Sequence, residues 1–192
     1  PAENIRDAAL AVSGLLHPAV GGRSVRPPQP KGVSDLTYGT FGSWTEDTGP
    51  ERYRRGLYIH FQRSSPYPLL MSFDAPDANV TCVARRRSNT PLQALNLLND
   101  PVFVEAAQAL AARTLLEAPP ARRLEHAFRL TLGRNPTAAE RRHLSSFLDE
   151  LQSEPAGSSG APSAFELDPR LTAVFTHISR LLLNLDEFIT RE

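Results

Sequence analysis

Cysteine is nearly absent from this chain of 192 residues, in which Cys82 is the only one. A single thiol excludes an internal disulfide, a metal site built of thiolates alone, and the Cys-x-x-Cys-His attachment of a c-type haem within these residues. The sequence also lacks a run of about 18 uncharged apolar residues and a basic amino end followed by an apolar segment. It therefore predicts neither a membrane span nor a signal peptide in this segment.

An excess of charge is missing as well, because 21 basic residues balance 21 acidic residues. No overall field attracts nucleic acid, so we expect no nucleic-acid partner. Lysine is scarce, with Lys31 as the one example, and neither a phosphate-binding glycine-rich loop nor a nucleophile elbow occurs. The five histidines show no close metal-ligand spacing. The sequence thus predicts no metal site and no cofactor in this segment.

Apolar residues at helical spacing dominate the rest of the chain and predict a mainly α, irregular helical bundle, with residues 1–192 as a single domain. Because the sequence runs directly into a helical pattern, we expect it to be part of a longer protein. Proline at the first helical position, capping side chains and apolar stripes predict helices from 5 to 12, from 91, from 101, from 124 to 132, from 138 to 151 and from 169 to 189.

Three further segments have weaker patterns. Residues 54–63 fit either a strand or a helical turn, and we favour the helix. Residues 18–50 are rich in glycine and proline, with aromatic residues between them, which predicts a long ordered loop. Residues 155–163 hold little that can be buried and predict a flexible loop.

The densest polar signal lies between Phe73 and Asp100. Asp74 and Asp77 are candidates for an acid and base pair or for ligands of a hard cation. The alternative, which we favour, is turn chemistry in which these carboxylates cap backbone N–H groups. We expect a structural polar cluster, made of Asp74, Asp77, Arg85, Thr90, Asn99 and Asp100.

A run of three arginines follows in the same region, and guanidinium groups offer the paired donors that oxyanions prefer. The candidate anion-binding or substrate-binding residues are Arg85, Arg86, Arg87, Asn89 and Gln93. In the alternative that we favour, one or two of the arginines pair with Asp74, Asp77 or Asp100 and fix an irregular loop.

Two other features have a chemical and a structural interpretation. Cys82 is a candidate nucleophile, but no histidine lies within about twenty residues of it, so we expect a small buried apolar residue. Tyr38, Trp44, Tyr58 and Tyr67 would form a glycan-binding surface if their rings shared one exposed face.

Several sequence motifs along almost the whole chain resemble those of one family. They include residues 1–7 (PAENIRD), 53–58 (YRRGLY), 73–77 (FDAPD), 89–95 (NTPLQAL) and 97–101 (LLNDP). They are similar to the planctomycete-type C-terminal domain of unknown function 1553, also called the PSD domain. The sequence departs from the usual pattern at Arg23, at Gly56 and around Cys82.

The resemblance implies a context more than a reaction. Such domains form the C-terminal end of large exported proteins that often carry a c-type cytochrome domain upstream. The resemblance therefore implies an extracytoplasmic location, and any haem would be bound by an upstream domain. We expect a non-catalytic structural or interaction module whose partners are the upstream domains of the same polypeptide. The alternative is an enzyme or binding domain for an anionic or glycan substrate that uses Asp74 or Asp77 with Arg85 or Arg87.

Overall fold

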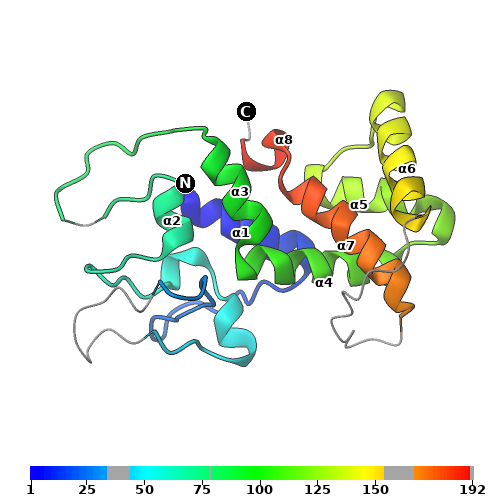
Figure 1. The fold of residues 1–192 in the computed structure, drawn as a ribbon. Coiled ribbons are helices and arrows are strands. Elements are labelled where there is room, and N and C mark those ends of the chain that lie inside the picture. The colour runs from blue at the N-terminus through cyan, green and yellow to red at the C-terminus, as the bar shows by residue number, and fades with distance from the viewer. Residues whose placement is uncertain (34–43, 78, 154–166, 191–192) are drawn as a thin grey trace. The chain divides into compact units, whose positions relative to one another are not determined.

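Helices form most of the structure, a computed structural model that describes residues 1–33, 44–77, 79–153 and 167–190 (Figure 1). No strand occurs in these ranges beyond two isolated bridges, so the predicted mainly α class is confirmed. The α-helices are α1 (Ala2–Ser13), α2 (Pro68–Ser72), α3 (Pro91–Asn99), α4 (Pro101–Glu117), α5 (Arg123–Leu132), α6 (Ala138–Ser153), α7 (Pro169–Leu183) and α8 (Asp186–Ile189). Short 3-10 helices are η3 (Gly49–Tyr53), η4 (Gly56–Tyr58) and η5 (Pro120–Arg122).

The chain divides into two compact units, with boundaries inside α1, shortly after α1 and inside α4. Unit 1 comprises Pro1–Ala11 and Leu15–Val104, and unit 2 comprises Val12–Gly14 and Glu105–Glu192.

Unit 1 joins short helices to irregular backbone, and its α2 packs against α3. Its buried apolar side chains come from both kinds of segment, for example Leu10 in α1, Val25 in the loop after it and Leu97 in α3. Residues 18–33 and 44–48 form no helix, yet Pro27, Pro28 and Gln29 are buried. Residues 34–43 of the predicted loop lie outside the described residues.

The prediction of a helix over 54–63 is wrong except for one 3-10 turn, η4. Ile59 instead forms a parallel bridge with Val25, in which Val25 N–H donates to Tyr58 O over 2.8 Å and His60 N–H donates to Val25 O over 2.7 Å. The alternating apolar pattern is therefore satisfied by pairing with distant backbone. A second bridge joins His17 and Arg54.

Unit 2 buries the apolar faces of its helices in two clusters. α6 packs against α7, and α5 contacts α6, α7 and α8. The buried side chains of one cluster are Ala127, Phe128, Leu144, Ile178 and Leu182, and those of the other are Ala111, Leu115 and Phe175. Gly133 ends α5 in the left-handed conformation, with φ of 73°, as its place after the apolar stripe predicts.

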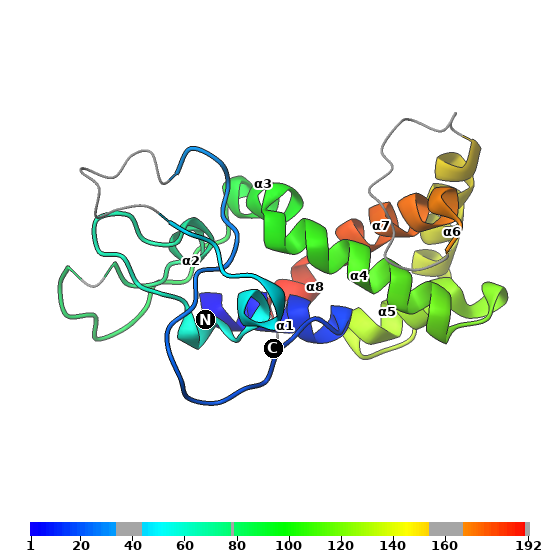
Figure 2. The ribbon, with the colours of Figure 1, turned by 90° about the horizontal axis from the view of Figure 1, so that it is seen from below.

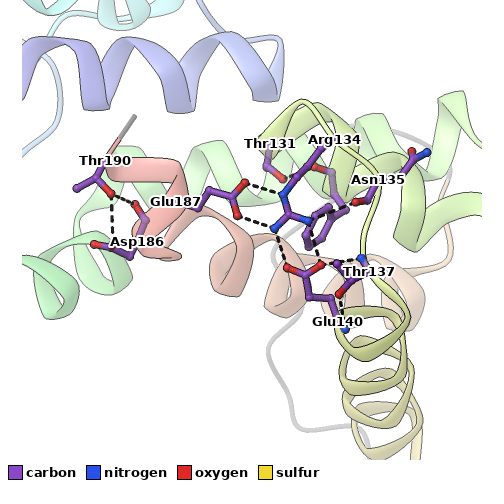
Figure 3. Close-up of polar contacts among 9 residues, drawn as sticks. Thr131, Arg134, Asn135, Thr137, Glu140, Asp186, Glu187 and Thr190 are labelled. Carbon is purple, nitrogen blue, oxygen red and sulfur yellow. Dashed lines mark hydrogen bonds and ion pairs between the residues drawn. The ribbon is translucent and has the colours of Figure 1, made fainter. Parts of the chain in front are cut away.

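An arginine between two carboxylates fixes the turn between α5 and α6 (Figure 3). Arg134 donates to both oxygens of Glu140, over 2.7 and 3.0 Å, and to both oxygens of Glu187 in α8, over 2.6 and 2.7 Å. Glu140 also accepts from Thr137 N–H over 2.7 Å, and Thr137 Oγ1 accepts from Glu140 N–H over 3.3 Å. The predicted capping box at the start of α6 is thus confirmed, and it is joined to α8.

The last helix is shorter than predicted. The side chain of Asp168 accepts from Arg170 N–H over 2.9 Å, as expected of its cap, but α7 ends at Leu183. Asn184 N–H turns back onto the carbonyls of Leu181 and Leu182, and a new short helix, α8, begins at Asp186. The break changes the helical phase, so that Phe188 is buried while Leu185 and Ile189 are half-buried.

The flexible loop predicted for residues 155–163 lies outside the described residues. Within the described ranges, none of the helices has both the length and the apolar character needed to cross a membrane.

Candidate functional site

The loop between α2 and α3, of which residues 73–77 and 79–90 are described, carries most of the residues that the sequence singled out. Both views show this loop, the excursion, extending away from α2 and α3 (Figures 1 and 2). Asp74 lies at its start with φ of 59°, a left-handed conformation that a non-glycine residue seldom adopts. Its Oδ2 accepts from Ser88 N–H over 2.8 Å and from Ser88 Oγ over 2.7 Å. Asp74 thus joins the two ends of the excursion.

Asp77 makes a separate, local set of contacts. One carboxylate oxygen accepts from Asn79 N–H and the other from Asn79 Nδ2, both over 3.0 Å. The side-chain and backbone hydrogen bonds from Asn79 lower the pKa of Asp77 below its ordinary value. Asn79 Oδ1 also accepts from Arg63 Nε over 3.1 Å. These contacts are those of an Asx turn, as the favoured interpretation of the sequence predicts.

Gln93 connects the end of the excursion with α2. It forms a capping box with Thr90, in which its Oε1 accepts from Thr90 N–H over 3.0 Å. Its Nε2 donates to Ser72 O over 2.9 Å and to Ser88 Oγ over 3.0 Å. Asn96 Nδ2 donates to Ser72 Oγ over 2.7 Å. Gln93 is buried, and these contacts use its amide in holding α2, α3 and the loop together.

The three arginines do not pair with the predicted aspartates. Arg85 Nη1 donates to Glu3 Oε2 of α1 over 2.7 Å, a hydrogen bond that raises the pKa of Arg85. Burial alone would raise the pKa of Glu3, yet the contacts with Arg85, its own backbone N–H and the positive amino terminus together lower it. Arg86 and Arg87 are exposed, and no hydrogen bond or ion pair joins either side chain to another described residue.

The remaining members of the predicted polar cluster lie at the junction of α3 and α4, where Asn99 bonds within α3 and Asp100 caps α4. Asp100 is buried, and its Oδ1 accepts from Val102 N–H over 2.9 Å at the start of α4. Asn99 Nδ2 donates to Leu95 O over 2.8 Å. The named residues therefore act in several local sets, among which Asp74, Ser88, Thr90 and Gln93 form the connected one.

Cys82 corrects a prediction. The sequence interpretation as a small buried apolar residue is wrong, since Cys82 is exposed, with its Sγ 3.3 Å from Ala84 O. Its loop lies outside the helices, so no core is available to bury the side chain. Among the described residues, no group of three or more His, Cys, Asp or Glu side chains is arranged to hold a metal ion.

Two buried arginines stabilise the fold of unit 1 through hydrogen bonds to distant backbone, and the sequence did not predict these roles. Arg6 of α1 donates through Nη2 to Arg52 O over 2.8 Å and through Nη1 to Arg54 O over 2.5 Å. Arg54 in turn donates to the carbonyls of Arg23, Ala19 and Gly21, and its guanidinium lies 4.0 Å from the centre of the Tyr58 ring. Burial lowers the pKa of Arg6. No local motif signals these roles, because the acceptors are backbone carbonyls distant in sequence.

The aromatic residues are divided between packing and exposure. Tyr67 is buried, donates to Pro28 O over 2.6 Å and stacks on Trp44 at a centroid distance of 5.8 Å. Burial raises the pKa of Tyr67 well above its ordinary value. Trp44 and Tyr58 are half-buried, and Tyr38 lies outside the described residues. The buried ring of Tyr67 offers no face to a sugar.

Ser24 and His60 form a hydroxyl and imidazole pair that the sequence analysis did not single out. Ser24 Oγ lies 3.3 Å from His60 Nδ1, and burial followed by the charge of Arg26 lowers the pKa of His60. Within the described ranges no carboxylate hydrogen-bonds to His60. The pair therefore lacks the orienting acid of a catalytic triad.

Comparison with known proteins places the chain in a family without assigning a reaction. Neither a curated protein nor a solved structure matches it. A family-wide sequence profile named PSD1 and described as "Protein of unknown function (DUF1553)" matches residues 1–148, well over half of the chain. The chain belongs to the DUF1553 family.

Proposed function

We propose that this segment is a non-catalytic structural and interaction module at the C-terminal end of a larger, exported multidomain protein. The multidomain and exported context rests on the family resemblance, and it implies an extracytoplasmic location. Upstream domains of the same polypeptide are its proposed partners. A c-type cytochrome domain is one such companion, and any haem belongs there, because the lone Cys82 excludes a Cys-x-x-Cys-His attachment in this segment.

The observation that carries the proposal is the use of the candidate acids within their own loop. Asp74 Oδ2 accepts two hydrogen bonds from Ser88, and both oxygens of Asp77 accept from Asn79. Carboxylates that act as general acid or base need an open position toward the substrate proton. Here both oxygens of Asp77 stabilise a turn and one oxygen of Asp74 closes a loop, which supports a structural role.

The rival function is an enzyme or binding domain for an anionic or glycan substrate. It requires Asp74 or Asp77 and Arg85 or Arg87 to act on one molecule. The contact of Arg85 with Glu3 and the engagement of both aspartates weaken that interpretation.

A turnover assay separates the two functions. The purified chain is tested with nitrophenyl glycosides, esters, phosphates and sulfates from acidic to neutral pH, beside the double variant Asp74→Asn and Asp77→Asn. We expect the wild type and the variant to give the same background rate. Turnover by the wild type that the double variant abolishes, while its circular dichroism spectrum stays native, would establish an enzyme and reject the proposal.

A binding assay tests the interaction role. The chain and the upstream domains of the same protein, prepared separately, are mixed in a titration calorimeter. We expect a saturable complex with a stoichiometry of one to one. Absence of heat and of co-elution on size exclusion would contradict the module role.

A further inference from the structure

The excursion between α2 and α3 exposes apolar side chains that nothing among the described residues covers. Every described residue from 79 to 92 is exposed. Val80 and Val83 have 76% and 98% of their surface in contact with solvent. Val80 and Val83 are therefore available to an apolar surface of a partner.

α3, which follows the loop in sequence, exposes further apolar side chains. Leu92 and Leu95 are both exposed and lie three residues apart, which places them on one face of the helix. Eight of the nine exposed large apolar side chains of the described residues belong to unit 1, and these four come from residues 80–95.

Hydrogen bonds hold both ends of the loop, so its path leaves and rejoins the fold at fixed points. At one end Asn79 is held by Asp77 and Arg63. At the other end Ser88 is held by Asp74, and Arg85 is tied to Glu3 of α1. Anchored ends limit the conformational entropy that the loop loses when a partner binds it.

The positive charge of the loop indicates what kind of partner it would bind. From residue 79 to residue 99 the sequence has three arginines and no acidic residue. Arg86 and Arg87 are exposed and hydrogen-bond to no other described residue. Guanidinium groups pair best with carboxylates, through two parallel hydrogen bonds.

We propose that residues 79–90, together with Leu92 and Leu95, form a docking surface for another protein whose matching surface combines carboxylates with an apolar groove. The inference rests on the proposed function as an interaction module and adds the site and the partner's chemistry. A protein is a better fit than a lipid bilayer, because residues 79–92 include no Trp, Tyr or Phe to anchor in a membrane interface.

The test is to pan a random-peptide phage library against the full chain and to synthesise the enriched peptide with a fluorescent label. We expect enriched sequences that combine Asp or Glu with Leu, Ile or Phe. Anisotropy titrations then compare the wild type, the variant Arg86→Glu with Arg87→Glu, the variant Val83→Ser, and a charge-matched control. The control, Arg122→Glu with Arg129→Glu, changes two exposed arginines of unit 2.

Charge reversal in the loop should weaken binding by about tenfold or more, and the affinity of the wild type should fall as salt rises. Val83→Ser should weaken binding by about threefold or more. The unit 2 control should bind as the wild type does. Thermal melts of all variants identify any loss of affinity that comes from unfolding, and a loop variant that unfolds is replaced by Arg86→Gln with Arg87→Gln.

Three results would overturn the proposal: no enrichment, enriched peptides without carboxylates, and equal binding by every folded variant. Two others would assign the surface to a different occupant and also overturn it. One is a wild-type dimer in sedimentation that charge reversal dissociates. The other is loop-dependent binding to phosphatidylserine vesicles without peptide binding. None of these results depends on turnover, so the docking surface can fail while the non-catalytic function stands.

Discussion

Arg134 and Glu187 are joined by two parallel hydrogen bonds, from Nε to Oε1 over 2.7 Å and from Nη2 to Oε2 over 2.6 Å, although 53 residues separate them. The same guanidinium holds Glu140 and lies 4.9 Å from the centre of the Phe128 ring. One side chain thereby links the end of α5, the start of α6 and α8 within unit 2.

The contacts of Arg134 with Glu140 and Glu187, the Arg134 clamp, make the free energy of unfolding depend on pH in the acid range. The hydrogen bond from Arg134, with those from Thr137, lowers the pKa of Glu140 to about 2, and Arg134 lowers the pKa of Glu187. Because these pKa values are lower in the folded state, the stabilisation is fully present above the ordinary value of 4.5 and is lost as pH falls toward about 2. Urea unfolding followed between these pH values should show a declining free energy of unfolding.

Glu140→Gln should reduce that decline, because glutamine keeps the cap but carries no charge. Glu150→Gln, at an exposed position on the same helix, is the matched control and should leave the pH dependence as in the wild type. An unchanged pH profile in Glu140→Gln would show that the clamp does not contribute.

Arg6 should be among the most costly residues to remove from unit 1. Arg6→Met leaves the carbonyls of Arg52 and Arg54 without their donor, and we expect a loss of about 3 kcal/mol or more. Arg55→Ala removes the half-exposed partner of Asp7, which keeps its hydrogen bond from Gly56 N–H, and should cost about 1 kcal/mol. Chemical unfolding curves measure both, and equal costs for the two variants would contradict the role of Arg6.

Gly56 should tolerate no side chain. A Cβ there would lie 2.9 Å from both Cα and Cβ of Glu3, and backbone cannot move aside cheaply. We expect Gly56→Ala to destabilise unit 1 by about 1–3 kcal/mol. Gly32→Asn is the control, since nothing lies within 4 Å of Gly32 and asparagine accepts its positive φ. A native melting temperature for Gly56→Ala would refute the close approach.

Asp74 should control the order of the arginine-bearing loop. Asp74→Ala loses both hydrogen bonds to Ser88 and retains an unfavourable φ, so we expect a cost of about 1–2 kcal/mol. Limited trypsin digestion should cut after Arg85, Arg86 or Arg87 faster in this variant. Asp74→Asn, which keeps one acceptor and suits positive φ, should be cut at a rate nearer the wild type. Equal cutting of Asp74→Ala and the wild type would contradict the closure by Asp74.

Local chemistry determined much of this protein directly from its sequence. The capping side chains Thr90, Asp100, Thr137 and Asp168 lie next to the helices they begin, so their roles depend only on nearby backbone N–H groups. The Asx turn at Asp77 is local in the same way. Membership of the family, shown by the match over residues 1–148, also follows from the sequence without the structure.

Tertiary structure decided what depends on distant backbone. Arg6 and Arg54 are buried because carbonyls tens of residues away replace their water, and no spacing in the sequence shows this. Arg85 pairs with Glu3 across 82 residues, where the sequence favoured the nearby aspartates. Cys82 is exposed because its loop leaves the helices, and residue type predicts burial only where a core is within reach.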